Sequence, residues 1–430
     1  MGGNGRAARR RAVVIGGSVG GLFAGNFLLR QGWDVDIYER ANEGLASRGL
    51  GIAAHDELET LISAAGAAMP QPLGIEVRGR SAFDRTGRLI ANFDFPQHLA
   101  AWTGVFNSLH KAFPRERYHN GCELVGIDAS ETGSHARFAN GNTVEADLIV
   151  GADGFRSTVR AVVAPHVNPR YAGYVAWRGV VEESALSAEF RSETINQFAF
   201  VFPRASEFIG YPVPGDDGSA DLGRRRYNFL WYYPVSPGAA LDDILTDDQG
   251  RLHDYSIAPP LIRAEHIEKL KQSARELLPA KFLEVFGAAK RYMVQPIYDV
   301  ESERIGFDDV ALIGDAGFVA RPHVGVGVLK AGRDALELTK CLSSTPTVSA
   351  ALELYQRTRV DDGRKSVAAG RRLGAFIERG LDGPWADPSL GLSVQDIIRV
   401  SGRPVVESEP QASRMAGPGD ASATRLNQHQ

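Results

Sequence analysis

The sequence of 430 residues is poor in cysteine, carries no large net charge and contains no long apolar run. Its two cysteines, Cys122 and Cys341, argue against a disulfide framework and a cysteine-based metal site, and they favour a reducing, cytoplasmic compartment. We expect no metal. The formal net charge is only −4, so no overall field attracts nucleic acid or an anionic membrane. The expected partner is a small molecule.

No stretch approaches the length of a membrane-spanning helix. Residues 1–11 are basic and glycine-rich, but the apolar segment that follows is only residues 12–15, which is too short for the core of a signal peptide. Hydrophobic residues make up 43% of the chain, enough for a substantial core and two closely packed domains.

The first forty residues have the pattern of a strand-helix-strand unit. Residues 12–15 are typical of a buried parallel strand, and after a glycine-rich turn the apolar residues recur with helical spacing. Val35 and Ile37 mark a second strand that ends at Glu39 and Arg40. This order predicts the start of a doubly wound α/β domain.

The turn between this strand and helix reads Gly-Gly-Ser-Val-Gly-Gly, with Ser18 in place of the usual middle glycine. Such a turn brings backbone N–H groups to a pyrophosphate at the positive end of a helix. Glu39 follows Gly21 by eighteen residues, where a carboxylate accepts hydrogen bonds from ribose hydroxyls. The alternative is a tight turn without a nucleotide. The predicted nucleotide contacts are Gly16, Ser18, Val19, Gly21, Glu39 and Arg40.

Two later segments carry a similar signal. Residues 147–160 form an apolar strand that runs into an Asp153-Gly154 turn, and residues 310–317 form a strand that ends at Gly314-Asp315. Residues 321–328 then read Arg-Pro-His-Val-Gly-Val-Gly-Val. Each segment alone is typical of a strand end with a turn. The three together, in this order, are specific.

Together the three segments resemble those of the class A flavoprotein aromatic hydroxylases, the family of para-hydroxybenzoate hydroxylase. Residues 171–179, 210–215, 226–232 and 321–323 resemble the branch that contains 2,6-dihydroxypyridine 3-monooxygenase. The resemblance covers most of the chain. It implies non-covalent FAD, NADH or NADPH as a transient co-substrate, and hydroxylation of an electron-rich aromatic or N-heteroaromatic ring, hydroxypyridine-like or phenolic, by O2 through a flavin hydroperoxide. It also implies a homodimer.

The same resemblance assigns cofactor residues. Asp315 would accept hydrogen bonds from the ribityl hydroxyls, Asp153 would support both FAD and the passing nicotinamide, and Arg48 would lie beneath the flavin. A helix that begins near residue 327 would direct its positive end at the reduced flavin. The positions beside the flavin ring are Pro322, Gly325, Val326, Gly327 and Val328. Many relatives place an arginine in a helix that here contains Asn107 and Lys111, so either of these takes over or the contact is missing.

For the substrate, the sequence offers one histidine and several aromatic residues. His323 is the predicted catalytic residue, because it lies between positions expected beside the flavin and an unperturbed imidazole titrates near neutral pH. The alternative is a purely structural histidine. Further candidates are Tyr211, Trp231, Tyr232 and Gln295, and ordinary sheet packing is the alternative for each aromatic.

The predicted fold is α/β, with a Rossmann-like FAD-binding domain interleaved with a mostly antiparallel sheet domain and followed by C-terminal helices. We expect residues 1–75, 98–170 and 290–345 in the FAD-binding domain, 76–97 and 171–289 in the substrate-binding sheet, 346–380 in a helical segment, and a loose tail at 405–430. Other functions remain open: a reductase, an epoxidase, or a nucleotide-binding module without catalysis. The Trp-x-Trp-x-Ile-Pro segment that a flavin-dependent halogenase requires does not occur.

Overall fold

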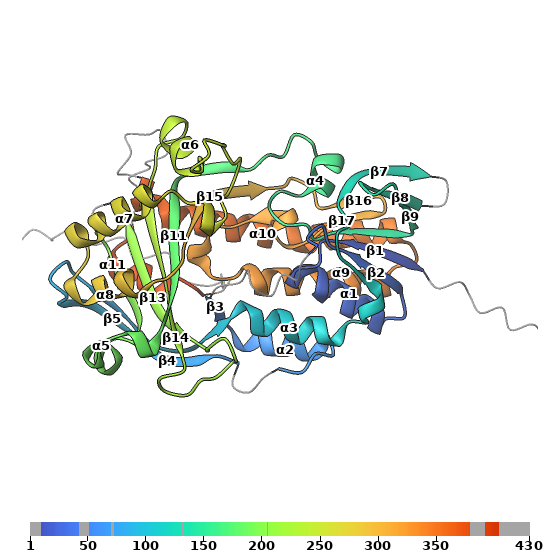
Figure 1. Ribbon diagram of the computed structural model, residues 1–430. Coiled ribbons are helices and arrows are strands. Elements are labelled where there is room, and N and C mark those ends of the chain that lie inside the picture. Colours follow the sequence, from blue (N-terminus) through green and yellow to red (C-terminus); the bar gives the residue numbers. More distant parts are fainter. Residues whose placement is uncertain are drawn as a thin grey trace, which may run out of the picture.

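The computed structural model describes residues 10–42, 51–69, 73–130, 133–203, 205–378 and 392–403. Two large sheets dominate it, one toward each end of the molecule (Figure 1). One sheet is largely parallel and carries helices α1 and α9, whereas the other is largely antiparallel and carries α7 and α8 on its outer side. The long helix α10 runs between the two ends. This confirms the predicted α/β fold class.

The six-stranded sheet has the doubly wound beginning that the sequence predicts. Strand β1 pairs in parallel with β2 on one side and β10 on the other, and β10 pairs in parallel with β17. In sheet order its strands are β16 (Gly306–Phe307), β17 (Val310–Leu312), β10 (Leu148–Gly151), β1 (Arg11–Ile15), β2 (Asp34–Tyr38) and β6 (Tyr118–His119). Because parallel strands end at one edge, the turns after β1, β10 and β17 lie together.

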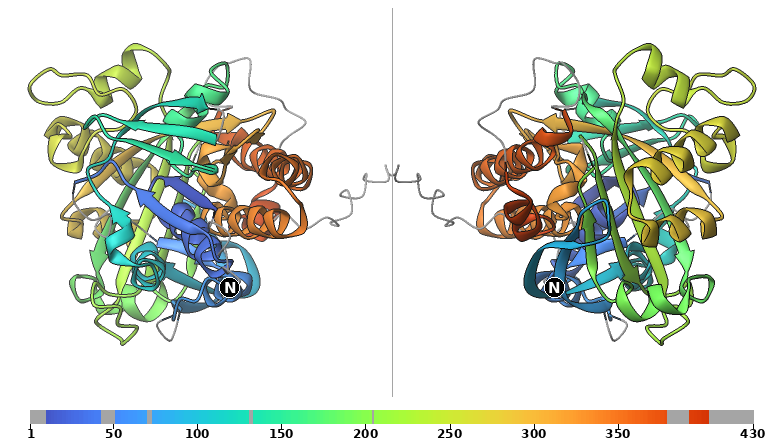
Figure 2. Two further views of the ribbon diagram at one scale, coloured as in Figure 1. Left: turned by 90° about the vertical axis from the view of Figure 1, so that its right-hand side faces the viewer. Right: turned by 90° about the vertical axis from the view of Figure 1, so that its left-hand side faces the viewer.

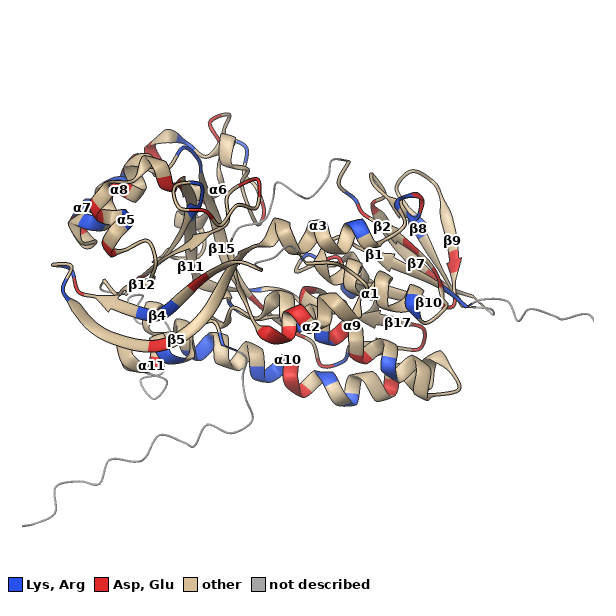
Figure 3. Ribbon diagram, turned by 90° about the horizontal axis from the view of Figure 1, so that it is seen from below, with Lys and Arg blue, Asp and Glu red and all other residues tan. Residues whose placement is uncertain are grey.

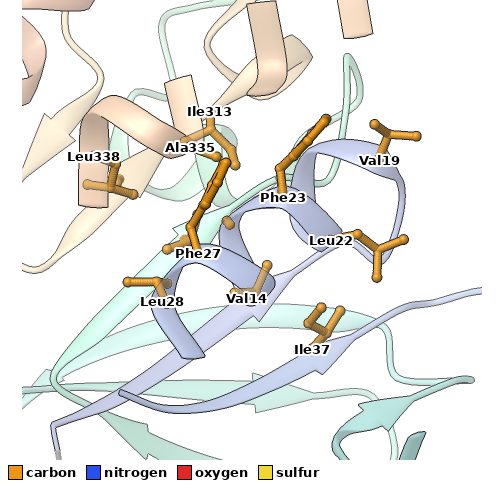
Figure 4. Packing of buried hydrophobic residues seen from close by; sticks show 14 of the residues in the cluster. Val14, Val19, Leu22, Phe23, Phe27, Leu28, Ile37, Ile313, Ala335 and Leu338 are labelled. Atoms are coloured by element: carbon orange, nitrogen blue, oxygen red, sulfur yellow. The ribbon is translucent and has the colours of Figure 1, made fainter. Parts of the chain in front are cut away.

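Helix α1 (Val19–Arg30) lies between this sheet and α9 (Gly327–Ser344). Figure 4 shows Val14 and Ile37 of the strands on one side of α1, with Ala335 and Leu338 of α9 on the other. Phe23 is fully buried in this cluster. Because α1 is covered on both sides, its position relative to the strand ends is fixed by packing.

The nine-stranded sheet is antiparallel except where β12 pairs with β4. In sheet order its strands are β18 (Phe318–Val319), β15 (Tyr292–Glu301), β11 (Arg170–Glu182), β14 (Arg226–Pro234), β13 (Glu207–Val213), β12 (Phe198–Val201), β4 (Ile75–Phe83), β5 (Leu89–Ala101) and β3 (Gly51–Ala54). It therefore includes β3, β15 and β18, which lie outside the boundaries predicted for the sheet domain. The division into domains stays a prediction.

The two faces of this sheet bury different clusters. One face packs against α5 (Ala188–Glu193), α6 (Ala239–Leu245), α7 (Ala264–Leu277) and α8 (Ala280–Ala288). Figure 1 shows α7 and α8 at the end of the molecule away from the six-stranded sheet, and in the end-on views of Figure 2 the yellow helices lie on the side opposite the orange helix α10. The opposite face carries a second cluster that includes Tyr174, Tyr211 and Tyr232. Since side chains alternate along a strand, each strand contributes to both clusters.

Smaller elements complete the described chain. They are α2 (Asp56–Ala64), α3 (Trp102–Ala112), α4 (Thr158–Val163) and the three-stranded sheet of β7 (Leu124–Ser130), β8 (Gly133–Phe138) and β9 (Thr143–Ala146). Helix α10 (Val348–Glu378) matches the predicted C-terminal helical segment and carries charges of both signs along its length (Figure 3). Among the described helices, none combines the length and apolar character needed to cross a bilayer.

One helix lies between the segment predicted to be helical and the tail predicted to be loose. A further helix, α11 (Val394–Val400), begins with a capping box formed by Ser393 and Asp396. It buries Ile398 against the nine-stranded sheet. The fully buried Arg80 of β4 donates to the carbonyl oxygens of Ile398, at 2.9 Å, and of Ser401. These contacts hold the C-terminal segment on the sheet.

Candidate cofactor and substrate site

A cavity of about 600 Å³ lies between the two large sheets. Its walls come from the turns after β1, β10 and β17, the start of α9, the inner face of β11, β13 and β14, and residues Ser401 and Gly402. Ligands of open α/β sheets bind outside the carboxyl ends of the strands. The structure thus brings the three sequence segments together around one space.

The glycines of the β1–α1 turn have separate roles. Gly16 has φ +101°, and a Cβ there would lie 2.5 Å from the Ala152 carbonyl oxygen. Gly21 does not line the cavity, because it packs on the turn itself, where a Cβ would lie 1.9 Å from the Gly16 oxygen. Gly16, Ser18 and Val19 do line it. Since the Ser18 side chain does not cap α1 and the first turn has no acidic residue, the N–H groups there remain open to an anion.

Glu39 is placed as the nucleotide prediction requires. It is buried and lines the cavity beside the exposed Arg40. Its Oε2 accepts a hydrogen bond from the Gly17 N–H at 2.8 Å, and its Oε1 accepts one from the Ala41 N–H at 2.9 Å. These bonds hold the carboxylate still and leave each oxygen a further lone pair for a ribose hydroxyl.

The carboxylates of the other two turns differ in their surroundings. Asp153 accepts hydrogen bonds at the start of α4 from the Ser157 hydroxyl at 2.5 Å and the Thr158 N–H at 2.7 Å. Burial raises the pKa of Asp153, and these bonds oppose the rise. Asp315 faces the cavity, and burial raises its pKa while the cation of Lys330 lowers it. No hydrogen bond to the Asp315 carboxylate forms within the described part of the chain, so its oxygens remain available for hydroxyl donors.

Residues 322–328 form the cavity wall beside Asp315. Pro322, Gly325, Val326, Gly327 and Val328 all line it, and Gly325 adopts φ +61° in a turn where a Cβ would lie 2.6 Å from the Gly402 Cα. Arg48 lies outside the described residues. Asn107 and Lys111 are exposed on α3 and do not line the cavity, whereas Trp102 of the same helix does. Neither replaces the family arginine at the cavity in this structure.

His323 lines the cavity, but its imidazole has no accessible surface. Nε2 lies 2.9 Å from the Tyr174 hydroxyl, and Nδ1 lies 2.9 Å from Oε2 of Glu207, whose side chain is also fully buried. The ring of Tyr232 stacks against it with a centroid distance of 4.0 Å. The side chain is thus enclosed between a carboxylate and a tyrosine, and its Nδ1 makes no hydrogen bond within the described chain despite lying close to Glu207. A role in turnover stays a prediction.

For Trp231, a predicted substrate contact, the structure differs from the prediction. Trp231 and Tyr232 are adjacent on β14, so their side chains point to opposite faces of the sheet. Trp231 lies in the cluster under the outer helices, donates to the Ser206 hydroxyl at 3.2 Å and does not line the cavity. Tyr232 does line it, as does Tyr211, whose hydroxyl donates to the Gly51 carbonyl oxygen at 3.0 Å.

The sequence prediction missed Arg178. This residue on β11 lines the cavity, and its Nη1 donates to the side-chain oxygen of Gln295 at 2.9 Å. Gln295 itself does not line the cavity and contributes through Arg178. The alternation of β11 could have identified Arg178, since Val175, Trp177 and Val181 belong to the outer cluster and the residues between them face inward. Ser401 and Gly402 had no comparable signal.

Comparisons with known proteins bear on this site. A sequence profile described as "FAD binding domain-like" matches residues 171–299. The chain is 28% identical over 393 residues to 2,6-dihydroxypyridine 3-monooxygenase of Paenarthrobacter nicotinovorans, covering 90% of this chain and 96% of that protein. It is 27% identical over 387 residues to the aurachin C monooxygenase/isomerase of Stigmatella aurantiaca, covering 84% and 88%. The structure of 2,6-dihydroxypyridine-3-hydroxylase from Arthrobacter nicotinovorans superposes with a TM-score of 0.81 at 27% identity, covering 87% of this chain and 95% of that one. The chain is thus similar over most of its length to FAD-dependent aromatic hydroxylases.

The cavity of this aromatic hydroxylase suits its FAD. At Gly16 and Gly21 a Cβ would clash with neighbouring backbone, so only glycine fits the turn. Glu39 is held by two N–H groups, and Asp315 presents free carboxylate oxygens. These groups match a pyrophosphate, a ribose and a ribityl chain in turn. The enzyme is a monooxygenase with a small-molecule substrate, and NAD(P)H is its co-substrate. Which cavity residues contact each part of FAD stays a prediction.

Proposed function

We propose that the protein hydroxylates a small ring that carries a hydroxyl group, of the hydroxypyridine or phenol type, with NAD(P)H and O2. The observation that carries this proposal is the shared cavity, in which the nucleotide turns of one sheet meet the aromatic inner face of the other. The similarity to 2,6-dihydroxypyridine 3-monooxygenase, at 28% identity, supports a hydroxypyridine. The inner face around Tyr211 and Tyr232 is of the apolar, sparsely polar kind that binds such rings.

In this proposal each cofactor group has its own residues. Gly16, Ser18 and Val19 receive the pyrophosphate, Glu39 and Arg40 lie at the adenosine, and Asp315 accepts hydrogen bonds from the ribityl chain. Gly21 supports them by letting α1 approach β1. Residues 322 and 325–328 border the flavin ring, and Asp153 supports both FAD and the passing nicotinamide.

When bound, FAD would supply the redox chemistry that links NAD(P)H oxidation to the activation of O2. The chain's own contribution is to bind, orient and exclude water. The start of α9 at Gly327 places its positive end at the cavity and stabilises negative charge on the bound ring system. Buried aromatic walls keep water away from the reacting groups.

We also propose that the protein works as a cytoplasmic homodimer. Its two cysteines form no disulfide in the structure, which supports a reducing compartment. Symmetric pairing is the commonest assembly of such proteins. The same proposal keeps the two-unit organisation predicted for 1–345, with the sheet extended by β3, β15 and β18. A monomer mass in light scattering at every concentration tested would refute the dimer.

The decisive experiment measures coupled turnover. The purified protein should be yellow, and a panel containing 2,6-dihydroxypyridine, simple phenols and 6-methylsalicylate should be tested with NADH and with NADPH. We expect at least one ring to stimulate NAD(P)H oxidation and to yield a hydroxylated product with little hydrogen peroxide. NAD(P)H oxidation without oxygen incorporation would indicate a reductase. A colourless protein that takes up no FAD would indicate a binding module without catalysis.

A further inference from the structure

The guanidinium of Arg178 lies near Tyr211 and Tyr232, where the nine-stranded sheet lines the cavity. Arg178 lies on β11, opposite Leu230 of β14 and Met293 of β15. Its side chain points to the inner face, whereas its neighbour Trp177 packs under the outer helices. Gln295 accepts a hydrogen bond from its Nη1 and so orients the guanidinium. Arg178 is thus a positioned charge on a rigid strand.

This charge is not neutralised within the described chain. No carboxylate forms an ion pair with Arg178 there, and its Nε is buried without a hydrogen-bond partner. By contrast, the neighbouring Arg321, which also lines the cavity, pairs with Asp299 at 3.0 Å. A guanidinium has five N–H donors, and the half-buried Arg178 has only the Nη1 donor engaged within the described chain. Its open donors therefore suit an anion that enters the cavity.

The surrounding groups cannot supply that anion. Tyr211 on β13 and Tyr232 on β14 are the titratable side chains beside Arg178, while β15 presents Met293 and Gln295. Burial raises the pKa of Tyr211 to about 12 and that of Tyr232 well above its ordinary value, although Arg178 lowers both. Both hydroxyls stay protonated at neutral pH. Behind Tyr232, Glu207 is already engaged by His323.

Among the described residues, no base for the substrate faces this end of the cavity either. The imidazole of His323 is fully buried, with Nε2 2.9 Å from the Tyr174 hydroxyl and Nδ1 2.9 Å from Oε2 of the buried Glu207. Hydroxylation of a ring nevertheless proceeds best when its hydroxyl group is deprotonated, since the oxyanion makes the ring electron-rich. A fixed cation meets this need without a base, because it lowers the pKa of a hydroxyl that binds next to it.

We propose that Arg178 binds the ring substrate as an anion, through a negatively charged oxygen, and that the enzyme selects anionic rings on this basis. The proposal rests on the proposed function. A deprotonated ring hydroxyl and a carboxylate share this chemistry, since either oxygen accepts a charge-assisted hydrogen bond from a guanidinium. Gln295 is the positioning residue that holds the guanidinium toward the ring.

Binding of the substrate to the oxidised holoenzyme, without NAD(P)H, tests the proposal apart from turnover. 2,6-Dihydroxypyridine is titrated between pH 5 and 9, and the change in flavin absorbance gives Kd. In the wild type, Kd should decrease about tenfold for each unit by which pH rises toward the pKa of the ring hydroxyl, because only the anion binds well. Above that pKa, Kd should stay constant. The tyrosines beside Arg178 do not titrate in this range.

Substitutions then assign the effect. Arg178→Met should weaken binding by roughly tenfold to a hundredfold and abolish the pH dependence, because it removes a charge-assisted hydrogen bond. Arg178→Lys should keep the pH dependence with weaker binding, since the charge remains but the fork geometry is lost. Arg170→Met is the matched control, because Arg170 is exposed on the same strand and does not line the cavity. Without ligand, Arg178→Met should melt no lower than the wild type.

The outcomes separate the two proposals. If the rings bind to wild type and Arg178→Met with the same Kd and pH profile, the role of Arg178 is overturned while the proposed function stands. If Arg178→Met instead loses its FAD, the arginine serves the cofactor and the inference is likewise overturned. If no ring alters the wild-type flavin spectrum at any pH, the proposed function itself is overturned. Phenol, which lacks a carboxylate, and benzoate, which lacks a hydroxyl, show which anionic oxygen is bound.

Discussion

Trp231 and Tyr232 are neighbours on β14, and the structure predicts opposite consequences for the same kind of change at the two positions. Trp231→Phe should destabilise the fold and leave ligand binding intact, because Trp231 packs under the outer helices. Tyr232→Phe should leave the fold intact and weaken binding of the ring, because Tyr232 lines the cavity. Each variant is the control for the other.

The magnitudes follow from what each side chain contacts. Trp231 is fully buried, and its Nε1 donates to the buried Ser206 hydroxyl. Stranding that hydroxyl costs about 1–3 kcal/mol, and the lost indole volume raises the total to about 2–4 kcal/mol. At about 2.1 cal/mol/K per residue, 430 residues give an unfolding entropy near 0.9 kcal/mol/K, so Tm should fall by roughly 2–4 °C. The hydroxyl of Tyr232 has no hydrogen-bond partner in the described chain, so its removal should change stability by under about 0.5 kcal/mol.

Thermal unfolding of the holoenzyme and the titration of flavin absorbance with 2,6-dihydroxypyridine measure both effects. Tyr232→Phe should raise Kd by roughly threefold to tenfold, which is the value of one hydrogen bond to the ligand. The reasoning is refuted if Trp231→Phe raises Kd as much as Tyr232→Phe does while Tm stays unchanged. In that case β14 would present the opposite register to the cavity.

Four further substitutions test other parts of the structure. Asp315→Ala should purify with little flavin, because it removes the free carboxylate of the cavity wall; full occupancy with unchanged FAD affinity in an equilibrium titration would exclude the ribityl role. Gly21→Ala should lose FAD affinity and stability together, since its Cβ would meet the preceding turn at 1.9 Å, and fluorescence titration with melting checks both. His323→Ala should bind FAD but unfold about 3–5 kcal/mol more easily in urea, because a buried carboxylate loses its partner; unchanged stability would refute the stabilising role of this pair. Burial raises the pKa of Glu183, but the hydrogen bonds from Arg225 and the Gly223 N–H together with the charge of Arg225 outweigh it, so the net pKa is lowered. The stability lost in Glu183→Gln should therefore be full above the ordinary carboxyl pKa and shrink as pH falls through the lowered one, as denaturation at pH 7 and pH 4 would show.

Much of the fold could be predicted because local patterns and global topology agree. The apolar run at 12–15, the glycine turn and the acidic residue at 39 each indicate the same strand-helix-strand unit, which the structure contains. The short runs rich in aromatic and apolar residues at 198–202, 209–212 and 227–233 likewise become β12, β13 and β14. Where three turns follow three parallel strands, adjacency at one edge of the sheet follows from topology alone.

The remainder depends on information that a single sequence does not display. Whether Trp231 or Tyr232 faces the cavity depends on register, which the neighbouring strands set. The burial of His323 depends on Glu207, a residue 116 positions earlier whose carboxylate lies inside the core. Helix α11 has only seven residues, which are too few to show a helical periodicity in the sequence.

The contribution of Ser401 and Gly402 to the cavity has a consequence for how the enzyme acquires its cofactor in the cell. The Gly402 N–H donates to the His323 carbonyl oxygen at 2.8 Å, and Arg80 fastens the adjoining helix end to the sheet. During translation the phosphate-binding turn leaves the ribosome early and can fold with its own strands. Ser401 and Gly402, however, are encoded almost four hundred residues after that turn. A chain synthesised only as far as residue 400 would hold FAD in an incomplete enclosure, so firm binding of the cofactor requires this late-encoded segment.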